Sequence, residues 1–203
     1  DVYKRQMEFW TQDEFQAFLE CVADKPISYY AFEMLYWTGI REGELLALTP
    51  ADFNFEKKTL RINKSYQRLE GKDIITDPKT PKSNRTIVMP DFLAVEMEDF
   101  ISSLYGIKDN DRNFTISKSY LHHEMDRGAK LAGVKRIRIH GLRHSHISLL
   151  INLGFSALAI GERVGHEAVD ITYHYAHLFP TVQTDMAAQL ETEREALVNV
   201  RKE

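Results

Sequence analysis

Residues 140–153 read His-Gly-Leu-Arg-His-Ser-His-Ile-Ser-Leu-Leu-Ile-Asn-Leu. At 100° per residue, His140, Arg143 and His144 fall on one face of a helix, and beyond its first turn the segment is apolar nearly all round. Such a helix is expected to be buried, so imidazole and guanidinium groups at its first turn indicate that this end lines a site. The simpler interpretation is a satisfied core histidine beside an arginine that caps a neighbouring helix.

Helical patterns surround this segment, and a short β region interrupts them. Thr11 to Glu14 forms a capping box that begins the first helix. Residues 59–63 and 86–89 alternate like strands, with a possible third strand at 72–76 and a basic hairpin. The prediction is an α+β fold, mainly α, in which a helical domain holds one small three-stranded antiparallel sheet. Further helices are expected at 27–37, 41–48, 91–104, 118–131, 140–153, 156–164, 171–179 and 181–200.

The bulk properties suit a globular protein of one large domain or two small ones. The chain has 203 residues, of which 43% are hydrophobic and 28% charged. Residues 1–10 are expected to be a leader or linker remnant, and residues 11–203 the folded domain. The single cysteine, Cys21, excludes an internal disulfide framework. The most apolar stretch, 147–160, is too short and too interrupted to span a membrane, and no signal peptide is present, so a cytoplasmic location is expected.

The charge distribution gives weak evidence for a nucleic-acid partner. A formal net charge of −4 argues mildly against one. However, residues 127–143 contain six basic side chains and no acidic one, and residues 61–85 contain seven basic against three acidic side chains. Because a run of charge is usually a solvated face, this pattern decides nothing alone.

A second segment whose residues could take part in a reaction is 38–45, Thr-Gly-Ile-Arg-Glu-Gly-Glu-Leu. A glycine turn opens a helix with Arg41 at its start and Glu44 one turn later on the same side. An arginine there offers a planar, permanently charged fork for phosphate oxygens. Considered alone, the pattern more often marks a surface Arg–Glu pair.

Residues 164–177 form a third segment, with a Gly-His turn followed by Tyr173 and Tyr175 on a short helix. A lone tyrosine in such a place is usually an amphipathic core residue. The spacing of His140 and His144 also invites a zinc interpretation, but the metalloprotease pattern needs Glu where Gly141 stands, and a neighbouring arginine repels a cation. We therefore expect no metal.

Together these segments resemble the boxes of the tyrosine recombinase family, also called the phage integrase family. The resemblance covers the chain from Thr11 onward and lies in four motifs whose order and spacing match the family. The matching residues are Arg41 after the Thr-Gly turn, Lys79 in a hairpin turn, His140 and Arg143 in a His-x-x-Arg box, and His166 about nine positions before Tyr175.

The resemblance implies metal-independent cleavage and rejoining of DNA, with no cofactor. Arg41 and Arg143 would clamp the non-bridging phosphate oxygens, and His166 would add a hydrogen bond. Tyr175 would attack phosphorus to give a 3′-phosphotyrosyl intermediate, with His140 as its base. Tyr173 is the rival nucleophile, and the spacing from His166 favours Tyr175.

The remaining roles follow from the same resemblance. Lys79 would protonate the departing 5′ oxygen, with Lys82 as its rival, and Glu44 would hold Arg41 or His140 in position. Phosphate contacts around the duplex would be sequence-independent and salt-sensitive. The residues expected to make them are Lys82, Arg85, Lys130, Lys135, Arg136 and Arg138.

The expected partners are double-stranded DNA and other recombinase protomers, which form a tetramer in synapsis. The helix at 181–200 is a candidate for packing on a neighbouring protomer, or it folds back on its own domain. The family's N-terminal DNA-clamping domains are expected to be absent from this chain, leaving 11–203 as the catalytic domain. Nucleoid association and a phage or transposon origin are also expected.

Four alternatives remain open from the sequence. A catalytically silent relative would grip DNA without cutting it, and a type IB-like topoisomerase would relax supercoils without recognising a site. A metal-dependent hydrolase built on His140 and His144 predicts bound zinc and sensitivity to chelators. A purely structural helical module leaves the ordered spacing of four polar motifs unexplained.

Overall fold

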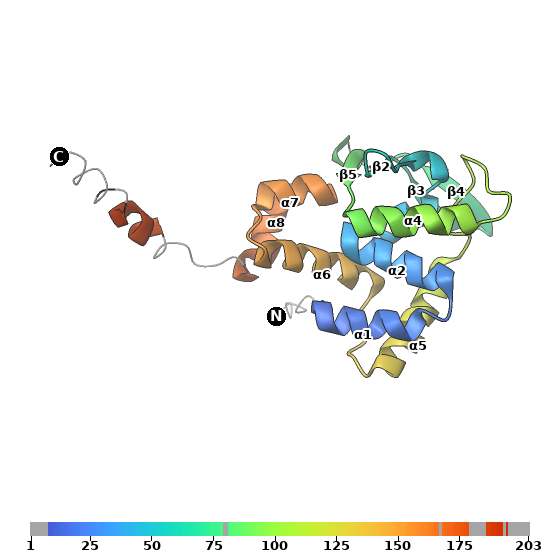
Figure 1. The fold of residues 1–203 in the computed structure, drawn as a ribbon, viewed down its shortest axis with the longest axis horizontal. Helices are drawn as coiled ribbons and strands as arrows, with labels where there is room; N and C mark the ends of the chain where they lie inside the picture. The colour runs from blue at the N-terminus through green and yellow to red at the C-terminus, as the bar shows by residue number, and fades with distance from the viewer. Residues whose placement is uncertain (1–7, 79–80, 167, 179–185, 193, 195–203) are drawn as a thin grey trace.

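The computed structural model describes residues 8–78, 81–166, 168–178, 186–192 and 194 (Figure 1). The α-helices are α1 (Gln12–Val22), α2 (Pro26–Thr38), α3 (Glu42–Ala47), α4 (Asp91–Ser103), α5 (Lys118–Ala132), α6 (Ile139–Asn152), α7 (Ala157–Val164) and α8 (Ala168–Tyr175). Short 3-10 turns lie at η1 (Pro50–Asp52), η2 (Pro81–Ser83) and η3 (Ala176–Leu178). The strands are β1 (Phe53–Asn54), β2 (Thr59–Ile62), β3 (Ser65–Leu69), β4 (Lys72–Thr76) and β5 (Arg85–Val88).

Local sequence signals set the helix ends. The Thr11 hydroxyl accepts from the backbone N–H of Glu14, and the Glu14 carboxylate accepts from the Thr11 N–H, so the predicted capping box is confirmed. Pro26 occupies the first position of α2, where its missing N–H removes no helical hydrogen bond. Gly39 ends α2 in the left-handed region, with φ of 65°.

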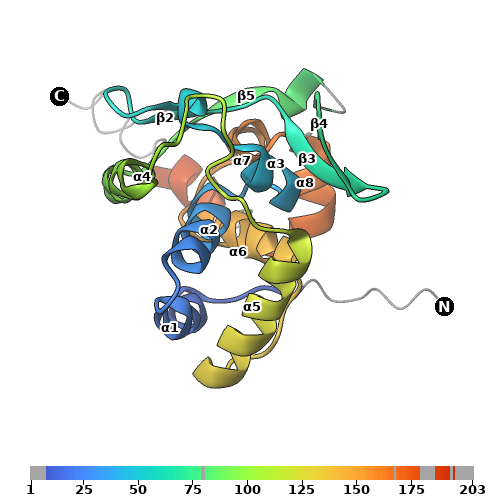
Figure 2. The ribbon, with the colours of Figure 1, turned by 90° about the vertical axis from the view of Figure 1, so that its right-hand side faces the viewer.

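The helices α2 and α6 lie side by side in the centre of the molecule (Figures 1 and 2). The strands and α4 lie at one end of the molecule, and α1 and α5 at the other. The prediction of a mainly helical α+β fold is therefore confirmed. Within the described residues, no helix is long and apolar enough to cross a membrane.

The sheet differs in detail from the predicted one. The three-stranded antiparallel sheet has the order β1-β2-β5, with Leu60 opposite both Phe53 and Ile87. The predicted third strand, 72–76, pairs instead with β3 in a separate hairpin. The tight turn at Glu70 and Gly71, both with positive φ, joins β4 to its nearest neighbour in sequence, which leaves the third position to β1.

The core has a large and a small part. The large part joins α1 to α6 with the sheet, and includes Trp10, Phe32 and Phe114. The small part is built by α6, α7 and α8, and Tyr175 belongs to it. The first turn of α6 packs in the large part through Ile139 and Leu142, and its later turns pack in the small part, so both parts hold this helix in place. The predicted helix at 181–200 lies mostly outside the described residues, although 186–192 are helical.

Candidate active site

Three segments that are distant in sequence meet at one cleft. It has a volume of about 880 Å³ and is lined by Arg41 and Glu44 from the start of α3, His140 from α6, and Gly165 and His166 after α7, among others. These are the three segments in which the sequence indicates chemistry, and the structure brings them together. Arg143 hydrogen-bonds to Gly39 and Val164, each next in sequence to a lining residue, and both Arg143 and Tyr175 are buried, with 2% and 4% of their surface exposed.

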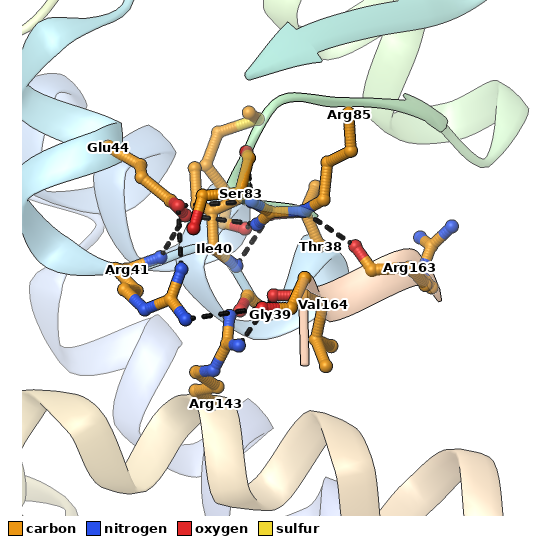
Figure 3. Close-up of polar contacts among 12 residues, drawn as sticks. Thr38, Gly39, Ile40, Arg41, Glu44, Ser83, Arg85, Arg143, Arg163 and Val164 are labelled. Carbon is orange, nitrogen blue, oxygen red and sulfur yellow. Dashed lines mark hydrogen bonds and ion pairs between the residues drawn. The ribbon is translucent and has the colours of Figure 1, made fainter. Parts of the chain in front are cut away.

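The C-terminal end of α7 gathers three arginines (Figure 3). The carbonyls of residues 163, 164 and 165 accept hydrogen bonds from Arg85 Nε, Arg143 Nη2 and Arg41 Nη2 at 2.8, 2.5 and 3.4 Å. A helix C-terminus carries a partial negative charge and unsatisfied carbonyls, so it is a natural anchor for guanidinium groups. One helix end therefore fixes both arginines that the sequence analysis assigned to phosphate binding.

Arg143 is locked between two backbone carbonyls. Its Nη1 donates to Gly39 O at 2.6 Å and its Nη2 to Val164 O, while its buried Nε has no acceptor among the described residues. Burial and the nearby charge of Arg41 lower the pKa of Arg143 to about 9, so it stays charged at neutral pH. A buried donor without an acceptor is a group that an incoming anion can satisfy.

Glu44 holds two of the arginines. Its carboxylate accepts from the Arg41 backbone N–H at 2.8 Å and from Arg41 Nη1 at 3.0 Å, and it forms two further bonds with Arg85, both 3.0 Å. Burial raises the pKa of Glu44, but the bonds from Arg85 and Arg41 outweigh it and lower the pKa overall. Of its two predicted partners, Arg41 and His140, it contacts Arg41. Three guanidinium groups against one carboxylate leave this cluster with an excess of positive charge.

Arg85, which the sequence predicts as a DNA contact, is buried in the structure. Its side chain is 6% exposed, it is paired with Glu44, and its Nε is committed to the carbonyl of Arg163. In the sequence Arg85 is one of several basic residues around a hairpin, and that pattern gives no sign that its side chain is buried. In the structure Arg85 lies on the inward face of β5. It supports Glu44, and through Glu44 it positions Arg41.

The two candidate tyrosines have opposite environments. Tyr173 is 80% exposed, whereas Tyr175 is buried, with its ring in the small core and its hydroxyl hydrogen-bonded to His144 Nδ1. Burial raises the pKa of Tyr175 well above its usual value, and the charge of Arg143 opposes this only in part. Tyr175 therefore keeps its proton at neutral pH and can donate it in a hydrogen bond.

Three histidines near Tyr175 are uncharged at neutral pH. Burial and the charges of Arg143 and Arg41 lower the pKa of His140. The same causes lower the pKa of His166 to about 4. Burial, followed by His140 and Arg143, lowers the pKa of His144 to about 4. The rings of His140 and His144 meet edge to face, 4.8 Å apart. Neutral imidazoles can accept as well as donate protons.

Two supporting residues, His146 and Arg163, were not predicted from the sequence. Arg163 Nε donates to His146 Nε2 at 3.0 Å, and its Nη groups donate to the carbonyls of Val88 and Trp37. The His146 ring packs against Gly39, where an added Cβ would lie 2.6 Å from it. No sequence signal pointed to Arg163, since an arginine in the last turn of a helix is ordinarily a surface residue.

The remaining predicted residues lie outside this cluster. Lys79 and the side chain of Lys82 fall outside the described residues. The predicted phosphate contacts between residues 130 and 138 are exposed on the surface. Arg136 forms an ion pair with Asp126 at 2.7 Å, and Lys135 forms one with Glu14 at 4.0 Å. The exposed set is Lys130, Lys135, Arg136 and Arg138. Within the described part of the chain, no group of three or more His, Cys, Asp or Glu side chains is placed to hold a metal.

Comparison with known proteins identifies the family. The model of the phage integrase family matches residues 8–181, and the chain belongs to that family. It is 29% identical over 203 residues to the ICEBs1 integrase of Bacillus subtilis (strain 168), covering 93% of this chain and 55% of that protein. It is also 29% identical to the integrase of Staphylococcus phage L54a over 179 residues, 79% of this chain and 51% of that one. The chain thus spans about half the length of the curated relatives it matches.

Solved structures share the fold. The integrase of transposon Tn1549, in complex with a circular intermediate DNA, superposes with a TM-score of 0.75 at 24% identity, over 96% of this chain and 67% of that one. The catalytic domain of bacteriophage HP1 integrase gives a TM-score of 0.64 at 20% identity, over 91% of this chain and 95% of that domain. The fold is therefore that of a tyrosine recombinase catalytic domain.

Proposed function

We propose that this chain is the catalytic domain of a site-specific DNA recombinase of a mobile element, which cleaves and rejoins DNA through Tyr175. One observation carries the proposal. The end of α7 holds Arg41 and Arg143 beside His140 and His166, and the Tyr175 hydroxyl reaches the same cluster. Phosphoryl transfer needs fixed positive charge around phosphorus and an oxygen nucleophile next to it, and this arrangement supplies both.

In the proposed reaction, a DNA phosphate enters the cleft and accepts hydrogen bonds from Arg41, Arg143 and His166. The Tyr175 oxygen attacks phosphorus, the bond from phosphorus to the 5′ oxygen breaks, and a 3′-phosphotyrosyl linkage forms. The phenol proton leaves through the histidines of α6, and Lys79 supplies a proton to the 5′ oxygen. Attack by a 5′-hydroxyl reverses the step, so rejoining consumes no nucleotide.

The proposed partners are double-stranded DNA and further protomers. Lys82, Lys130, Lys135, Arg136 and Arg138 would contact phosphates, and four protomers would assemble at synapsis, with residues 181–200 as a candidate contact between them. The solved complexes of related integrases with DNA support a DNA partner. Such a protein would act in the cytoplasm, on the nucleoid.

The test is covalent trapping on nicked duplexes that carry the junctions between the element and its host DNA. The full-length protein, with chelator added, is expected to form a denaturant-resistant adduct. Tyr175→Phe should abolish the adduct, and Tyr173→Phe is the matched control that should retain it, because Tyr173 is 80% exposed whereas Tyr175 is buried. A wild-type protein that binds these duplexes but forms no adduct overturns the enzyme proposal in favour of a silent DNA-binding relative. Relaxation of supercoiled DNA without any such site favours a topoisomerase.

A further inference from the structure

His144 is the side chain that contacts the hydroxyl of Tyr175, through its Nδ1. His140, predicted as the proton acceptor, lies one turn earlier on α6 and faces the cleft. Its ring is 4.8 Å from that of His144, and within the described part of the chain no hydrogen bond joins it to Tyr175. His144 is therefore the imidazole that contacts the proposed nucleophile, whereas His140 contacts His144.

The protonation states give this contact a direction. Tyr175 is protonated at neutral pH because burial raises its pKa. His144 is neutral because burial, with His140 and Arg143, lowers its pKa to about 4. Neutral His144 accepts at Nδ1 from the Tyr175 hydroxyl in the tautomer that carries its hydrogen on Nε2, and this is the tautomer that the inference uses. The phenol O–H of Tyr175 therefore already points along the path that its proton must take.

We propose that His144 takes the phenol proton of Tyr175 as that oxygen attacks the DNA phosphate. This inference rests on the proposed function. In the step, the Tyr175 O–H bond breaks and its proton moves to His144 Nδ1. The new bond joins the tyrosine oxygen to phosphorus, the bond to the 5′ oxygen breaks, and that oxygen is protonated by the proposed acid, Lys79. In rejoining, His144 returns its proton to the departing phenolate.

DNA itself would strengthen this base. The charged and titratable groups around His144 are His140, Arg143, His166, His174 and Tyr175. Of these, Arg143 is positively charged at neutral pH and lowers the pKa of His144. A phosphate beside Arg143 offsets that charge, and so makes the His144 imidazolium easier to form. The base would thus be strongest when substrate is in place, and the free protein would keep its nucleophile protonated.

The experiment is a single-turnover rate of adduct formation by the full-length protein on the nicked junction duplexes. The variants are His144→Ala and His144→Asn, with His123→Ala as the matched control, since His123 is an exposed histidine of α5 and is not among the groups around His144. Loss of a general base is expected to slow both His144 variants by about 10²–10⁴-fold. His123→Ala should keep the wild-type rate. Melting temperature and DNA affinity establish that each variant is folded.

Two readouts separate proton transfer from packing. The rate of the His144 variants should rise with pH where that of the wild type is level, because without a base more phenolate must form first. A duplex with sulfur in place of the 5′ oxygen should not restore the rate of adduct formation by the His144 variants. A sulfur leaving group removes only the need for an acid, and the variants lack a base. Three results would each overturn the inference. They are a rate restored by the sulfur duplex, a pH profile unchanged from wild type, and a wild-type rate in a folded His144 variant.

Failure of the proposed function gives a different result. It would appear as no adduct in the wild type itself, under conditions where the junction duplexes are bound. An adduct that forms in the wild type and is lost in Tyr175→Phe leaves the proposed function standing, whatever the His144 variants do.

Discussion

Glu44 and Arg85 form a buried two-point ion pair beneath the cleft, with both N–O distances at 3.0 Å. Each side chain is 6% exposed. The pair links the start of α3 to the inward face of β5, and the second function of Glu44 is to hold Arg41. The small sheet is therefore tied directly to the proposed phosphate-binding arginine.

Arg85→Ala is expected to destabilise the protein rather than simply weaken DNA binding. It leaves the buried Glu44 carboxylate without its main partner, and breaking a buried pair in this way costs about 3–5 kcal/mol. Urea unfolding measures the change, with Arg68→Ala as control, because Arg68 is an exposed arginine of the β3–β4 hairpin. Unchanged stability, with only a loss of salt-dependent DNA affinity, would restore the role predicted from sequence.

Gly39→Ala is expected to disturb the turn that precedes Arg41. The residue has φ of 65°, and its new Cβ would lie 2.6 Å from the buried His146 ring. Gly133→Ala is the matched control, since its φ is 67° but nothing lies within 4 Å of the added Cβ. The left-handed conformation alone costs about 1–2 kcal/mol, so Gly133→Ala should lose that amount and Gly39→Ala clearly more. Equal losses of unfolding free energy would contradict the packing role of His146.

Glu33 should make stability fall as pH rises. Burial, then the charge of Glu96, raises its pKa to about 7. The unfolded chain therefore releases the proton at lower pH than the folded one, and stability is lost between pH of roughly 4.5 and 7 by about 1–3 kcal/mol. Glu33→Gln should remove this part of the slope, and Glu20→Gln on the exposed face of α1 should not. Unfolding midpoints across this range measure it, and an identical slope in wild type and Glu33→Gln would contradict it.

Lys130 and Arg138 should contribute to DNA affinity through phosphates alone. Both are exposed and lie on the basic stretch that runs from α5 into α6. Each substitution by alanine should reduce the slope of log affinity against log salt by about 1 and weaken binding to all sequences alike. Binding titrations at several salt concentrations measure the slopes. Slopes equal to that of the wild type would place DNA on another face.

Much of this architecture could be predicted because its signals are local. The Thr11 capping box, the proline at the start of α2 and the apolar run of α6 each act within a few residues of sequence. The third strand could not be assigned, because the two-residue β1 carries no periodicity and pairing between strands is a long-range property.

The site could be predicted as a set of residues but not as a set of contacts. The arginines and histidines of the three boxes could be selected from the sequence, but the hydrogen bond between His144 and Tyr175 could not. Arg85 donates to the carbonyl of Arg163, and Arg163 donates to the carbonyl of Val88. Both contacts depend on where the end of α7 lies relative to β5. Such a placement is fixed by tertiary packing, which no spacing within one segment encodes.

The proposed function depends above all on the proposed covalent bond between Tyr175 and DNA. It is tested most directly by digesting the trapped adduct with protease and nuclease and locating the nucleotide-bearing residue by mass spectrometry. A nucleotide remnant attached through a 3′-phosphate to Tyr175 is the expected result. Attachment at Tyr173 or any other residue, or a trapped species with no nucleotide on a tyrosine, would contradict it.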